Sequence, residues 1–158
     1  MRPYRGIPID KPIDCGEFVY GWLVESGGHS YIIVGINPTF VYKTDNIVLL
    51  QSYLQVHPST VGQQIGIPDR NGVEIYKGDR VIEIFRNYFE NSSRIPEDCQ
   101  GRCRQEDVYE GTVIWWDSGW FLDTIENGHI ALTDGADELI VIGNIHDKET
   151  KDETQKDA

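Results

Sequence analysis

Short runs of aromatic and β-branched residues, each ended by a glycine-containing turn, recur along this chain and restrict the folds open to it. Such runs are typical of strands, and turn residues that accept positive φ angles join strands as hairpins. Helical periodicity is almost absent, so the sequence predicts an all-β protein. A chain of 158 residues can bury a core without a disulfide, a metal or a cofactor, and we expect none of these.

The turn signals predict where the strands lie. Gly27 and Gly28 reverse the chain in a first hairpin, and Asn71-Gly72 marks a second tight turn. Two further hairpins turn at Asp117-Ser118-Gly119 and at Asn127-Gly128. The strands expected around these turns cover residues 18–24, 31–34, 79–89, 112–116, 120–122, 129–132 and 138–145.

The same reading divides the chain into regions. We expect a small N-terminal β region over residues 1–60 and a second β region over 61–146. A polar connection at 90–110 predicts a long loop within the second region, which is either mobile or specialised. The tail at 147–158 has almost nothing apolar to bury, so we expect it to be disordered.

Acidic residues dominate the charge and are unevenly placed. The chain has 14 Lys and Arg against 26 Asp and Glu, a net charge of -12. This charge opposes approach to phosphate backbones and anionic lipids, so we expect neither a nucleic-acid partner nor a membrane. Residues 111–146 contain no Lys or Arg, and their six carboxylates belong to Asp117, Asp123, Glu126, Asp134, Asp137 and Glu138.

This acidic segment predicts the chemistry of a partner. Carboxylates alternating with strand residues project from one side of the C-terminal β-structure, and a basic protein surface is the expected complement. The partner of such a face is a basic protein, and the face acts as a decoy if it replaces a phosphate backbone. The alternative is a solvated face that only aids solubility.

Cysteines and catalytic motifs argue against an enzyme. Three cysteines, Cys15, Cys99 and Cys103, lack the spacing of a secreted disulfide framework and favour a reducing, cytoplasmic compartment. The last two could supply half of a zinc site, but no second ligand pair accompanies them, so no metal site is predicted. The sequence contains no nucleophile elbow, Walker loop, dinucleotide fingerprint or paired-histidine motif, so we predict a non-enzymatic protein.

Tryptophans supply the candidate contact surface. Adjacent residues of a strand point to opposite faces, so one of Trp115 and Trp116 should face outward. Exposed tryptophan is enriched among interface anchors, although a neighbouring strand or loop could equally cover it. The candidate protein-binding residues are therefore Trp115, Trp116, Trp120, Asp123, Glu126 and Asp134.

Three motifs follow one another along the chain. The longest is VHPSTVGQQIGIPDRNGVEIYKGDRV at residues 56–81, preceded by GEFVYG at 16–21 and followed by VIGNI at 141–145. In this order they resemble the YopX family of bacteriophage and prophage proteins. The resemblance implies a β-rich protein with an SH3-like barrel over residues 61–146, encoded by a phage or an integrated element and self-associating. A basic partner would then belong to the host or the phage. The resemblance implies no catalytic residues and no established activity.

Together these observations favour a self-associating protein-interaction module. Two other classes stay open at this point: an enzyme that acts at the 90–110 loop, and a nucleic-acid-binding barrel. The net charge of -12 opposes the second. The missing catalytic motifs oppose the first.

The first prediction concerns self-association. Small strand-rich domains must cover sheet edges and apolar patches, and a symmetric dimer or ring does so. We therefore expect light scattering at micromolar concentration to give a multiple of the 18.0 kDa chain mass. A mass of a single chain over the whole accessible concentration range would contradict the prediction.

Overall fold

A computed structural model describes residues 3–34, 42–44, 47–49, 53–89, 103–132 and 138–147 of the chain. Strands account for most of these ranges, and the helices among them are two single 3-10 turns. The predicted all-β class is thereby confirmed. The chain divides into two compact units, one of residues 1–64 with 146–158 and one of residues 65–145. We call them unit 1 and unit 2.

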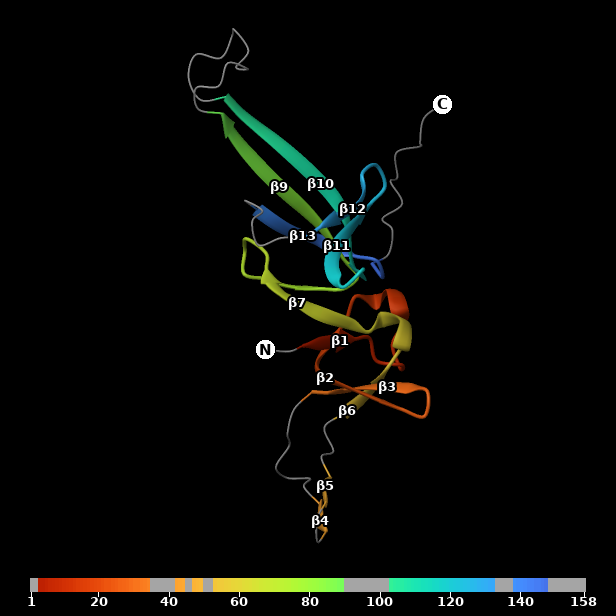
Figure 1. The fold of residues 1–158 in the computed structure, drawn as a ribbon. Coiled ribbons are helices and arrows are strands. Elements are labelled where there is room, and N and C mark those ends of the chain that lie inside the picture. The colour runs from red at the N-terminus through yellow and green to blue at the C-terminus, as the bar shows by residue number, and fades with distance from the viewer. Residues whose placement is uncertain are drawn as a thin grey trace, which may run out of the picture. The chain divides into compact units, whose positions relative to one another are not determined.

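Unit 1 is built on an antiparallel sheet (Figure 1). Its elements are β1 (Tyr4–Gly6), η1 (Ile13–Cys15), β2 (Val19–Ser26), β3 (His29–Ile33), β6 (Tyr53–Val56) and η3 (Pro58–Thr60). β4 (Tyr42–Thr44) and β5 (Ile47–Leu49) pair with each other. The predicted first hairpin is present, because Gly27 and Gly28, with φ of 58° and 79°, connect β2 to β3.

Close backbone packing holds the centre of unit 1. A Cβ atom at Gly21 of β2 would collide with the backbone oxygen of Ile33 on β3, so this position accepts only glycine. Ile7, Ile32 and Val56 have no exposed surface. The Ile7 N–H donates to Thr60 Oγ1 at 2.8 Å, which closes the loop after β1 onto η3.

β7 (Gly62–Pro68) carries the chain from unit 1 into unit 2. Gly62 and Gln63 pair with β1, and later residues of β7 border β8 (Glu74–Tyr76). The sheet order is β6-β3-β2-β1-β7-β8.

Unit 2 contains a second antiparallel sheet, of five strands, that curls into a half-barrel (Figure 1). Its strands are β9 (Asp79–Phe89), β10 (Cys103–Trp116), β11 (Gly119–Thr124), β12 (Gly128–Ala131) and β13 (Glu138–Asn144). Their order is β12-β11-β10-β9-β13, so the last strand returns beside the first strand of a four-stranded meander.

The loop expected at 90–110 is corrected in part. Residues 103–110 belong to β10 and pair with β9 in a long hairpin (Figure 1). A two-stranded ribbon is open to water on both faces, so a polar run is compatible with a strand there. Cross-strand side-chain contacts support the pairing: Phe85 and Tyr109 meet edge to face with centroids 6.2 Å apart. Residues 90–102 and 148–158 lie outside the described ranges.

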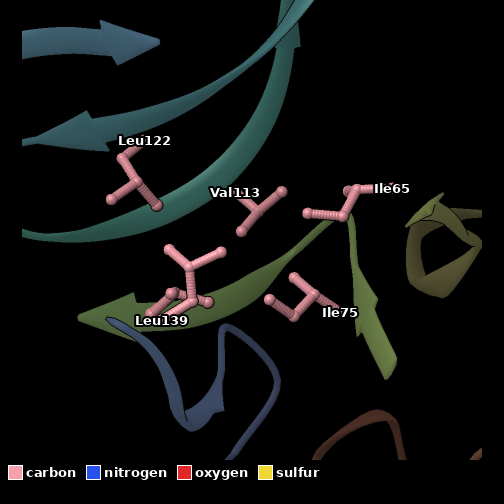
Figure 2. Packing of buried hydrophobic residues seen from close by; sticks show 6 residues of the cluster. Ile65, Ile75, Val113, Leu122 and Leu139 are labelled. Atoms are coloured by element: carbon pink, nitrogen blue, oxygen red, sulfur yellow. The ribbon is translucent and has the colours of Figure 1, made fainter. Parts of the chain in front are cut away.

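The core of unit 2 lies inside the curl of the sheet. Figure 2 shows its buried side chains converging from several strands. Ile75, Val81, Val113 and Leu122 have no exposed surface. Trp120 packs against this cluster from the side and stays partly exposed. Burial of these side chains is the main stabilising contribution to unit 2.

Two buried aspartates fasten the turns of unit 2 to β13. Asp69 Oδ1 accepts hydrogen bonds from the N–H groups of Asn71 and Val73, at 2.8 and 2.9 Å. Its Oδ2 accepts the Val141 N–H at 3.3 Å, where the register of β13 against β9 shifts. Burial raises the pKa of Asp69, but the three backbone hydrogen bonds outweigh it and the net pKa is lowered.

Asp79 does the same at the start of β9. Its Oδ2 accepts the Tyr76 N–H at 2.8 Å, and its Oδ1 accepts Asn144 Nδ2–H at 3.2 Å. Asp79 therefore joins the turn before β9 to the end of β13.

Replacing Asp69 tests the first of these fastenings. Asp69→Asn loses the charge that favours three N–H donors, so the free energy of unfolding should fall by about 1–3 kcal/mol at neutral pH. The wild-type advantage is fully present above the ordinary Asp pKa of 3.8 and is lost as the pH falls through the lower pKa of the folded state. Urea unfolding at neutral and strongly acidic pH measures both effects.

Asp117→Asn serves as the matched control, because Asp117 is an exposed turn residue of the same type. Its effect should stay within about 0.5 kcal/mol. Equal losses in the two variants, or a loss at Asp69 that does not shrink on acidification, would contradict the role assigned to Asp69.

Candidate protein-binding surface

The hairpin of β10 and β11 places the predicted site residues. Asp117 and Ser118 form its two-residue turn, with φ of 44° and 70°, as a tight hairpin turn requires. Gly119 already belongs to β11 and pairs with Trp116. This register fixes which side chains share a face, because residues directly opposite each other project to the same side.

One face of this hairpin is directed to the core. Val113 and Leu122 are opposite each other and fully buried, and Trp115 and Trp120 form the next pair toward the turn on the same face. The Trp115 and Trp120 rings meet edge to face with centroids 4.9 Å apart. Trp120 thus extends the core, whereas Trp115 is 54% exposed.

The opposite face, which we call the outer face, carries an aromatic cluster of Trp116, Phe121 and His129. Trp116 and Phe121 are perpendicular, at 89°, with centroids 5.2 Å apart. The His129 ring lies 4.7 Å from the Trp116 ring. His129 Nε2 is 3.3 Å from Asp123 Oδ1, across the β11–β12 pair. Trp116 is 47% exposed, so the cluster is open to solvent.

A groove of about 460 Å³ lies beside this cluster, at the turn between β11 and β12. Asp123 and Glu126 line it, and Glu110 lies on its β10 side. The turn is held in shape by Thr124, whose hydroxyl donates to the Gly128 carbonyl oxygen at 2.8 Å and accepts the Asn127 N–H at 3.0 Å. The groove is therefore formed by strands and a fixed turn.

The groove has a net negative charge. Three carboxylates and one guanidinium, that of Arg80, are among its lining groups. Arg80 is bound to Glu110, with 2.7 Å between Nη2 and Oε1. The charges of Arg80 and Glu110 cancel each other. Asp123 and Glu126 are exposed on the other side of the groove and give it its net negative charge.

Cations from outside the acidic segment reduce its charge elsewhere. Glu138 binds Arg86 and Arg70, with N–O distances of 2.5 and 2.7 Å. Hydrogen bonds from these two arginines lower the pKa of Glu138. The carboxylate of Glu138 therefore fastens β13 to its neighbours and is neutralised there.

The structure brings together three of the six predicted residues. Asp123 and Glu126 line one groove, and Asp123 contacts the outer cluster of Trp116 through His129. Trp115 and Trp120 lie on the opposite face of the sheet, as the alternation rule predicts for Trp115 and Trp116. Asp134 lies outside the described residues.

Sequence reasoning missed Glu110, Phe121 and His129. Glu110 falls just before the segment without Lys or Arg, in the polar stretch that predicts a loop. The signal for Phe121 was present in the two-residue turn, because pairing Trp116 with Gly119 puts Phe121 and Asp123 on the face of Trp116. The position of His129 depends instead on the register of β11 against β12.

Other chemistry is not found in the described part of the chain. Within those ranges, no three His, Cys, Asp or Glu side chains gather in a way that could hold a metal ion. Cys15 is a free thiol there. The half zinc site considered for Cys99 and Cys103 involves side chains outside the described part of the chain. None of the described helices is long and apolar enough to cross a membrane.

Comparison with known proteins gives a family match. A family model described as YopX protein matches residues 34–150, which covers most of the chain and all of unit 2. No curated protein matches the chain.

Proposed function

This chain belongs to the YopX family, and we propose that it is a non-enzymatic module that binds a basic protein segment through the groove of unit 2. The observation that carries the proposal is the groove itself: carboxylates of Asp123 and Glu126 beside exposed aromatic rings. Protein interfaces commonly combine aromatic anchors with charges that select the partner. We place the interaction in the cytoplasm of a host cell.

The chemistry of the groove favours a protein partner over nucleic acid or a small anion. Its net negative charge repels phosphate and attracts Lys and Arg side chains. The segment from 111 to 146 supplies no cation that would reverse this preference. A host protein that ordinarily binds nucleic acid has a surface of the required sign, and the groove would then act as a decoy for phosphate.

A defined variant pair tests the proposal. Asp123→Asn/Glu126→Gln removes the two carboxylates while keeping the size of both side chains. We expect its on-rate for a peptide of alternating arginine and serine to fall roughly 3- to 10-fold, because such charges act mainly by steering association. For the wild-type protein, the affinity should fall steeply as salt rises.

Asp10→Asn/Glu25→Gln is the control. It changes the net charge equally but alters exposed residues of unit 1. The on-rate of this variant should stay close to that of the wild type. If both double variants bind like the wild type at every salt concentration, the carboxylates of the groove serve solubility alone and the proposal is wrong.

Self-association is a second candidate function, favoured by a separate surface on unit 1. One face of β2, β3 and β6 exposes Trp22, Val24 and Tyr53, at 61%, 43% and 56%. The register places them on the same side of the sheet, and Val24 and Tyr53 line a pocket of about 340 Å³ there. Exposed apolar side chains in such a cluster are typical of contact surfaces between protein chains.

A further inference from the structure

The side chain of His129 lies close to an aromatic ring and to a carboxylate, which is the position that a cationic side chain of a ligand would take. Its ring lies 4.7 Å from the Trp116 ring, at an interplanar angle of 59°. Its Nε2 lies 3.3 Å from a carboxylate oxygen of Asp123. An aromatic ring and a carboxylate are the two partners that a protein offers to an organic cation.

The aromatic side of this place is held in position. Phe121 stands perpendicular to Trp116 and is itself half-buried, so it supports the indole. The two-residue turn at Asp117 and Ser118 fixes where Trp116 ends β10. The indole therefore offers a stacking surface whose orientation does not depend on a ligand.

From this geometry we infer that Trp116, Phe121 and Asp123 form a subsite for an arginine side chain of the partner, which takes the place of the His129 ring. The inference deepens the proposed function and rests on it. A guanidinium is planar, stacks on an indole and binds a carboxylate through parallel N–H groups. The compact ammonium group of lysine can use the charge but not the stacking surface.

The subsite also lies where a bound segment would pass. Asp123 belongs both to the aromatic cluster and to the groove lining. A chain that runs along the groove past Glu126 can thus direct one arginine onto Trp116 while its other cations face the carboxylates. The subsite accordingly selects arginine, and the groove supplies general attraction for basic residues.

Trp115 provides a matched control for Trp116. The two residues are neighbours on β10 and are similarly exposed, at 54% and 47%, but Trp115 lies on the opposite face. Loss of an exposed indole near the turn is common to both substitutions. Only Trp116→Ala removes the stacking surface beside Asp123.

The experiment uses the full chain and three short peptides that are identical except for one residue, arginine, lysine or the neutral citrulline. We expect the arginine peptide to bind roughly fivefold or more tightly than the lysine peptide, and the citrulline peptide to bind weakest. Trp116→Ala should weaken arginine binding roughly 5- to 30-fold and remove the arginine preference. Trp115→Ala should leave both unchanged, and His129→Ala should tighten binding.

A second measurement keeps the test independent of variant folding. On addition of the arginine peptide to the wild-type chain, the indole N–H resonance of Trp116 should shift more than that of Trp115. Equal arginine and lysine affinities, together with an unchanged affinity of Trp116→Ala, would overturn the subsite.

The outcomes separate this inference from the proposed function. If both cationic peptides bind equally and only the Asp123→Asn/Glu126→Gln variant weakens them, the groove stands and the arginine subsite is wrong. If none of the three peptides binds, or if the Asp123→Asn/Glu126→Gln variant binds them like the wild type, the proposed function is wrong as well.

Discussion

The unit that carries the candidate surface depends on two buried carboxylates that bind backbone N–H groups. Asp69 holds the turn after β7 and reaches Val141 of β13, and Asp79 links the turn before β9 to Asn144. The strand β13 is the last strand of the half-barrel along the chain, and its register against β9 shifts between Val141 and Gly143. An irregular strand leaves backbone groups that need partners, and the first aspartate supplies one.

A curled sheet of this kind separates two chemistries on its two faces. The inner face is filled largely by aliphatic side chains such as Val113 and Leu122, which form the core. The outer face does not have to bury apolar side chains, so it can carry charged groups and exposed aromatic rings. The residues for recognition and the residues for stability therefore alternate along the same strands, β10 and β11.

Turn chemistry made much of this architecture predictable. The glycine pair at Gly27 and Gly28, and the residues Asp117 and Ser118, fixed two hairpins, and the expected strand at 79–89 coincides with β9. The prediction of a loop over 90–110 was partly wrong. Strands are recognised in a sequence by apolar residues on one buried face, and a two-stranded ribbon has no buried face.

The candidate site was harder to predict than the strands. Composition identified Asp123 and Glu126 as part of an acidic segment, and alternation separated Trp115 from Trp116. Neither could reveal that Asp123 contacts His129, because that contact depends on the register of β11 against β12. The groove depends in addition on Glu110, which lies two residues before Thr112, the partner of Asp123 in the register of β10 and β11.

The central claim is that the outer face and groove of unit 2 receive a basic segment. Mapping of backbone amide shifts during titration with an alternating arginine and serine peptide tests it most directly. The account predicts that the largest changes fall at residues 110–116 and 121–129, with little change in unit 1. Changes concentrated around Trp22 and Tyr53, or spread evenly over both units, would contradict it.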